Sequence, residues 1–63
     1  MLKNKKLKEL ENKIFYGDYT DDEWREIDKA LDEEFAKASE EDKKAFIDNG
    51  AGNMLAMIME YMD

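Results

Sequence analysis

Apolar residues recur at a helical spacing through the middle of the chain, and polar residues fill the positions between them. Spacings of three and four residues place such side chains on one stripe of an α-helix. The stripe consists of Trp24, Ile27, Leu31, Phe35 and Ala38. The pattern predicts an amphipathic helix over residues 21–38, the longest in the chain.

The start of this helix is marked by side chains that cap unpaired backbone groups. Thr20 precedes the stripe and Glu23 follows three residues later, which is the spacing of a capping box. Tyr19 and Trp24 stand at the two positions where an apolar pair brackets the cap. We therefore expect Thr20 to be the N-cap.

A first helix is predicted over residues 2–16 and is followed by Gly17. A glycine at this place commonly ends a helix in the left-handed conformation. Lysines crowd the start of this helix, where the helix dipole disfavours cations, so residues 1–6 are expected to form a frayed basic arm. Such an arm either contacts a partner or is a solvated helix face. The apolar stripe of this helix consists of Leu7, Leu10 and Ile14.

Two shorter helices are predicted in the C-terminal part of the chain. Ser39 is the expected N-cap of a helix over residues 40–49, which stops at Asn49-Gly50. Asn53 is the expected cap of a last helix over residues 53–62. The helix after Ser39 is expected to offer to the core Ala45, Phe46 and Ile47.

Together these elements predict an all-α fold, a small three- to four-helix bundle that forms a single domain over residues 1–63. Proline is absent, β-branched residues are few, and the common residue types favour helices over strands. The predicted core consists of Leu7, Leu10, Ile14, Trp24, Ile27, Leu31, Phe35, Phe46, Leu55 and Ile58.

The last helix carries more apolar side chains than one small domain is expected to bury. Of the ten residues 53–62, only Asn53 and Glu60 are polar, and a helix that is apolar nearly all round must be covered on most sides. About half of these side chains are expected to fill the core. The surplus predicts a surface for self-association, as a homodimer, or for another partner. The residues of this surface are Met54, Met57, Ile58, Tyr61 and Met62.

Charge is distributed unevenly along the chain. The net charge is −7 at pH 7, yet residues 1–13 hold five lysines and two glutamates, whereas Asp18 to Glu34 hold nine acidic and two basic residues. A negative field of this kind repels nucleic acid and acidic membranes and attracts basic protein surfaces. The alternative is that the acidity only keeps a small domain soluble. The first interpretation predicts a protein partner with a basic surface, bound through Asp21, Asp22, Glu26, Asp28, Asp32, Glu33 and Glu34.

Several kinds of chemistry are not expected. The chain has no Cys and no His, and its one Ser is better explained as a helix cap, so we predict neither an enzyme nor a cofactor. A calcium loop starting at Asp48 would need oxygen ligands where Gly50, Gly52 and Met59 stand, so no metal is expected. Direct nucleic-acid binding would need a basic recognition helix. The only basic stretch is at the N-terminus, so no direct binding of nucleic acid is expected. No stretch approaches the ~20 apolar residues of a membrane span, and the thiol-free composition fits a cytoplasmic protein.

The run DEEFAKASEEDKKAFID from Asp32 to Asp48, with the Gly50-Ala51-Gly52 turn, resembles small acidic proteins encoded by phages and prophages. That class includes anti-restriction and anti-CRISPR inhibitors, some of which mimic the charge of DNA. The resemblance lies in size, charge and helical style over residues 18–63, and it assigns no individual functional residue. It implies an inhibitor that occupies a basic, nucleic-acid-binding site on a host or defence protein. The basic residues 1–13 depart from a uniformly acidic mimic. The alternative is a self-associating helical interaction module that uses the C-terminal helix and mimics no nucleic acid.

Overall fold

Four α-helices joined by short turns make up the fold of the computed structural model, which describes residues 2–62. They are α1 (Lys5–Tyr16), α2 (Asp21–Lys37), α3 (Glu40–Asp48) and α4 (Ala51–Glu60). No strand occurs among residues 2–62, so the predicted all-α bundle is confirmed.

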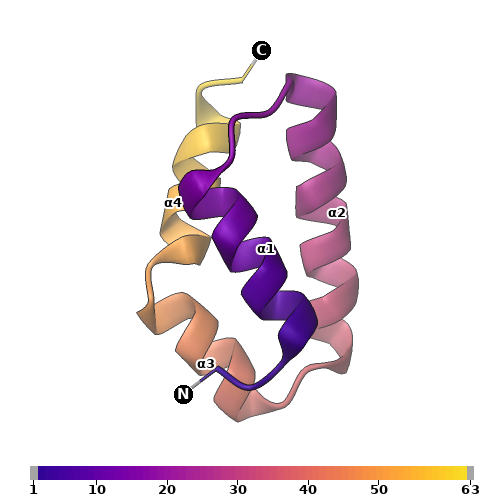
Figure 1. Ribbon diagram of the computed structural model, residues 1–63, viewed down its shortest axis with the longest axis vertical. Coiled ribbons are helices and arrows are strands. Elements are labelled where there is room, and N and C mark those ends of the chain that lie inside the picture. Colours follow the sequence, from indigo (N-terminus) through magenta and orange to yellow (C-terminus); the bar gives the residue numbers. More distant parts are fainter. Residues whose placement is uncertain (1, 63) are drawn as a thin grey trace.

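Helix α1 lies at the centre of the arrangement and packs against each of the other three helices. Figure 1 shows α2 along one side of the molecule, with α1 crossing in front between α2 and α4. Helix α3 lies at the end near the N-terminus, and α4 leads from it toward the opposite end, where the C-terminus lies. The acidic helix α2 therefore keeps most of its circumference open to solvent.

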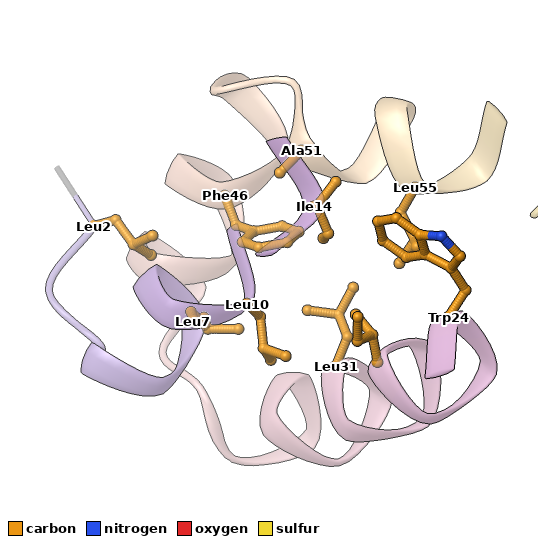
Figure 2. Packing of buried hydrophobic residues seen from close by; sticks show 10 residues of the cluster. Leu2, Leu7, Leu10, Ile14, Trp24, Leu31, Phe46, Ala51 and Leu55 are labelled. Atoms are coloured by element: carbon orange, nitrogen blue, oxygen red, sulfur yellow. The ribbon is translucent and has the colours of Figure 1, made fainter. Parts of the chain in front are cut away.

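The core is a single cluster to which every helix contributes (Figure 2). Eight of the ten predicted core residues are buried, while Phe35 and Ile58 are half-buried and pack against the cluster. Two buried residues were not predicted, Leu2 and Ala51. The buried set is Leu2, Leu7, Leu10, Ile14, Trp24, Ile27, Leu31, Phe46, Ala51 and Leu55.

Helix α3 places Phe46, and not Ile47, at the centre of the core. Phe46 is fully buried, and its ring meets the Phe35 ring edge to face at a centroid distance of 5.4 Å. Ile47 is 54% exposed, so the prediction that it faces the core is wrong. The reason is geometric, because the next residue of a helix points about 100° away from its neighbour and this short helix buries only a narrow stripe.

The N-terminal segment packs onto the bundle instead of forming a frayed arm. Leu2 is buried, and the backbone N–H of Lys3 donates to Asp42 Oδ1 at 2.8 Å. Helix α1 begins at Lys5, later than predicted, because Asn4 caps it: Asn4 Oδ1 accepts the Leu7 N–H at 3.1 Å. Met1 lies outside the described residues.

Helix α2 starts with the predicted capping box. The Thr20 N–H donates to Glu23 Oε1 at 3.0 Å, and the Glu23 N–H donates to Thr20 Oγ1 at 3.3 Å. The Tyr19 and Trp24 rings meet nearly at right angles at 5.2 Å, as expected for the apolar pair that brackets a cap. The helix ends at Lys37, one residue earlier than predicted.

Replacing Thr20 by alanine is expected to lower the free energy of unfolding by about 1 kcal/mol, because a first-turn N–H loses its acceptor. The measurement is urea unfolding followed by circular dichroism. Thr20→Ser keeps the hydroxyl and is expected to leave the unfolding curve nearly unchanged. Equal curves for wild type and Thr20→Ala would contradict the role assigned to this cap.

The glycines that follow α1 and α3 are needed for different reasons, backbone conformation at Gly50 and lack of space at Gly17. Gly50 has φ of +91°, the left-handed conformation, and stands at the predicted stop of the helix before it. Gly17 has φ of −87° and is extended, so the left-handed turn predicted there is wrong. A Cβ at Gly17 would overlap the Tyr19 ring and the Lys13 carbonyl oxygen, so a glycine is needed for space.

Helix α4 begins two residues earlier than predicted. Gly50 itself stands at the N-cap, with no side-chain hydrogen bond to the first turn, and Ala51 already belongs to the helix. Asn53 lies within α4 and is exposed, so its predicted role as the cap is wrong. The sharp left-handed turn lets the helix restart at once, and this brings Ala51 into the core.

Candidate protein-binding site

The seven carboxylates predicted to bind a partner all lie on α2, but they do not form one face. Asp21, Asp28 and Asp32 are separated by seven and four residues, which places them on one stripe. Spacings of four and seven residues place a second stripe on the outer side of the helix. The members of the second stripe are Asp22, Glu26 and Glu33. All six are exposed except Asp28, which is half-buried.

Two basic residues stand between these stripes. Helical spacing puts Arg25 and Lys29 on the strip of surface that separates the Asp21 side from the Asp22 side. Arg25 Nη1 lies 3.1 Å from Asp22 Oδ1, and both groups are largely exposed, so the pair adds little stability. The acidic surface is therefore two carboxylate rows with a basic row between them.

The seventh carboxylate, Glu34, faces away from both rows and contacts the cap of α1. Its side chain is only 17% exposed. Asn4 Nδ2 donates to Glu34 Oε2 at 3.4 Å, and Lys37 Nζ lies 3.6 Å from Glu34 Oε1. These contacts link the cap of α1 to α2, so Glu34 is tied into the fold while the two rows face solvent.

Glu23 is held ionised by the capping box. The backbone N–H of Thr20 and then its hydroxyl donate to this carboxylate, and these bonds lower the pKa of Glu23 below its ordinary value. On α3, the hydrogen bond to Asp48 and the charge of that residue raise the pKa of Lys44. Neither group is buried, so both shifts reflect local contacts at the surface.

A groove between α1 and α2 was not foreseen from the sequence. Its volume is about 280 Å³. A signal for it did exist, because Glu23, Glu26, Ile27 and Ala30 recur at helical spacing and the smallest of them leaves room on that face. The groove is lined by Leu10, Lys13, Tyr19, Glu23, Glu26, Ile27 and Ala30.

The five residues predicted for self-association divide into an exposed and a packed group. Met54, Met57 and Tyr61 are 37%, 57% and 84% exposed, and their spacing of three and four residues places them on one stripe. Ile58 and Met62 are half-buried and pack against the core. The free apolar surface of the C-terminal segment is therefore narrower than predicted and consists of Met54, Met57 and Tyr61, named here the α4 stripe.

No protein-family model matches the chain, and comparisons with characterised proteins and with solved structures gave no significant match. Among residues 2–62, no helix has the length and apolar character needed to cross a bilayer. Within the same residues, no three acidic side chains are grouped closely enough to hold a metal ion.

Proposed function

We propose that this protein is an inhibitor that binds a basic, nucleic-acid-binding site on another protein through the carboxylates of α2. The class is a small acidic helical protein of the kind that phages use against host or defence proteins. Asp21, Asp28 and Asp32 form one contact row. The other contact row is Asp22, Glu26 and Glu33.

The observation that carries this proposal is the density of charge along α2. From Asp21 to Glu34 there are eight acidic and two basic residues, a net charge of −6. These fourteen residues span about 20 Å, which gives roughly one net negative charge per 3.3 Å of helix axis. A single strand of DNA carries one phosphate per about 3.4 Å along the duplex axis. A site built to hold one nucleic-acid strand would therefore meet a similar density of negative charge in α2.

The fold supports this role because it presents the carboxylates without further ordering. Helix α2 is capped at its start, packs through Trp24, Ile27 and Leu31, and lies along the outside of the bundle (Figure 1). Groups that are already ordered lose little conformational entropy on binding. Rim charges also accelerate encounter with an oppositely charged site.

Reversing Asp28 and Asp32 to lysine together is expected to abolish capture of the partner by the immobilised protein. Wild-type protein should retain the partner at low salt and release it at high salt, because screening weakens contacts between exposed charges. A duplex oligonucleotide should also displace the partner, since both ligands are proposed to compete for one basic site. The measurement is the amount of partner retained on the immobilised protein in each condition.

The matched control is Asp48→Lys with Glu60→Lys, which changes the net charge equally but on α3 and α4. This control is expected to keep most of the binding. If both double variants lose the partner equally, only the overall charge matters and α2 is not the site. Binding that resists salt and survives the reversal at Asp28 and Asp32 would contradict the proposal.

A second candidate function is self-association through the α4 stripe, and the exposure of Met57 and Tyr61 favours it. Helix α4 carries a single charged residue, Glu60, so the repulsion between two acidic copies is weakest on this face. Methionine and tyrosine are suited to adaptable apolar contacts.

Sedimentation equilibrium at micromolar concentration is expected to give twice the monomer mass of 7.4 kDa if the α4 stripe pairs two copies. Salt should strengthen this dimer by screening the repulsion between the copies, which is opposite to its effect on a complex with a basic partner. Met57→Lys should restore the monomer. Met54→Lys should weaken the dimer less, because Met54 is less exposed than Met57. A monomer at every salt concentration would exclude this second function.

A further inference from the structure

We infer that the groove between α1 and α2 is a docking site for one arginine side chain of the basic partner. The inference rests on the proposed function, because the arginine belongs to the same partner surface that the α2 carboxylates meet. It adds a specific contact to a binding mode that would otherwise depend on general charge attraction. The groove combines an apolar floor with two carboxylates on one rim, which are the two features that a long basic side chain needs.

The floor of the groove matches the apolar stem of such a side chain. Leu10 and Ile27 are buried, Ala30 and Tyr19 are half-buried, and all four line the groove. Lysine and arginine commonly bury their methylene stems along apolar surface and keep the charged end in water. The volume of about 280 Å³ is close to the lower end of the ~300–1,000 Å³ of pockets for drug-sized ligands. The groove therefore has room for one long side chain.

The α2 rim supplies the charge that selects a cation. Glu23 and Glu26 stand three residues apart, so their Cβ atoms lie about 5–6 Å from one another. Glu23 Oε1 accepts both the N–H and the hydroxyl of Thr20, each at 3.0 Å, which fixes the carboxylate before any ligand arrives. Within residues 2–62, no ion pair or hydrogen bond engages the side chain of Glu26. Two neighbouring carboxylates suit the planar fork of a guanidinium better than the point charge of an ammonium.

The opposite rim carries one cation, Lys13 on α1. The rim as a whole therefore has two negative charges and one positive charge. A guanidinium is expected to lie on the α2 side, where it is near both carboxylates and away from Lys13. An anionic occupant would instead face the net negative charge of the rim and the −6 of α2.

The test is a titration of the full chain with the tripeptide Ac-Gly-Arg-Gly-NH2, followed by amide chemical shifts. Saturable shifts are expected at Leu10, Ile27 and Ala30. The tripeptide with citrulline, which has nearly the same shape without the charge, should bind at least about tenfold more weakly. The lysine tripeptide should bind a few-fold more weakly than the arginine tripeptide. Equal affinity for the arginine, lysine and citrulline probes, or arginine shifts spread evenly over all helices, would overturn the inference.

Two variants assign the contact to the groove. Glu26→Gln should weaken binding of the arginine tripeptide several-fold, whereas Glu60→Gln, which removes the same charge from α4 outside the groove, should not. Ala30→Met fills the groove and should abolish the saturable shifts. If Ala30→Met changes the fold as judged by circular dichroism, the comparison of Glu26→Gln with Glu60→Gln decides. Equal affinities for these two variants would overturn the inference.

Failure of this inference can be told apart from failure of the proposed function. If the partner is lost on reversing Asp28 and Asp32 but is captured normally by Ala30→Met, the inhibitor proposal stands and the groove is not used. If the arginine tripeptide binds the groove while no partner is captured in a salt-dependent way, the groove is an arginine-binding site and the inhibitor proposal fails.

Discussion

Replacing Phe46 by alanine is expected to lower the free energy of unfolding by about 3–5 kcal/mol, the range for removing a buried phenylalanine. Phe46 is fully buried among residues of α1 and α4 (Figure 2), and its ring packs edge to face against Phe35. A domain of 63 residues has a total stability of roughly 3–9 kcal/mol. Phe46→Ala should therefore remove from about a third to all of this stability.

The neighbouring residue supplies a matched control. Ile47 is 54% exposed, so Ile47→Ala should change the free energy of unfolding by only about 0.5 kcal/mol. Urea unfolding followed by circular dichroism compares both variants with wild type. If Ile47→Ala destabilises the protein as much as Phe46→Ala does, then α3 presents a different face to the core than the one described.

Replacing Gly17 by alanine is expected to lower the free energy of unfolding by about 1–3 kcal/mol, because the added methyl group is forced into occupied space. A Cβ at this position would overlap Tyr19 Cε2 and would lie 2.5 Å from the Lys13 carbonyl oxygen. The Tyr19 ring can move, but the Lys13 carbonyl belongs to the backbone of α1. The shift of the Tyr19 ring should also disturb its contact with Trp24 and the wall of the groove.

Substitutions at two other glycines distinguish the effect of crowding around an added Cβ from the effect of backbone conformation. Gly52 lies within α4 with nothing within 4 Å of an added Cβ, so Gly52→Ala should stabilise the protein by about 0.4–1 kcal/mol. Gly50 also has open space, but its φ of +91° is unfavourable for other residues, so Gly50→Ala should cost about 1–2 kcal/mol. Thermal unfolding of the three variants measures all of these effects. A neutral Gly17→Ala would show that the loop before α2 rearranges freely.

Most features that depend on residues three or four apart were predicted well, although the left-handed turn at Gly17 and the Asn53 cap were wrong. The Thr20–Glu23 capping box, the Ser39 cap and the stop at Gly50 are contacts or conformations within one turn of chain, and all three are present. The stripe through Trp24, Ile27 and Leu31 is equally local, because helical geometry alone brings these side chains to one face. Local signals of this kind are sufficient for the fold class.

Features that depend on distant parts of the chain were missed. Leu2 is buried because the N-terminal segment reaches α3, where the Lys3 N–H meets Asp42, 39 residues away. Glu34 was grouped with the partner-binding carboxylates, yet its contact with Asn4 spans 30 residues. Met62 was assigned only to a free surface and instead packs against the core, as does Ile58, which was assigned to both the core and that surface. Hydrophobic pattern does not say which of several apolar faces a neighbouring helix covers.

The sequence by itself determined the four helices of this protein, with their ends within three residues, because most caps and the spacing of apolar residues act over one or two helical turns. It also determined that α2 is densely acidic, since charge is a property of composition. Only the tertiary structure decided which surfaces remain open. Packing of α1 against α2 creates the groove beside Glu23 and Glu26, and packing of α4 reduces its free apolar surface to the α4 stripe. Burial and cavity shape arise from contacts between helices, and such contacts are set by how the helices cross and which side chains meet.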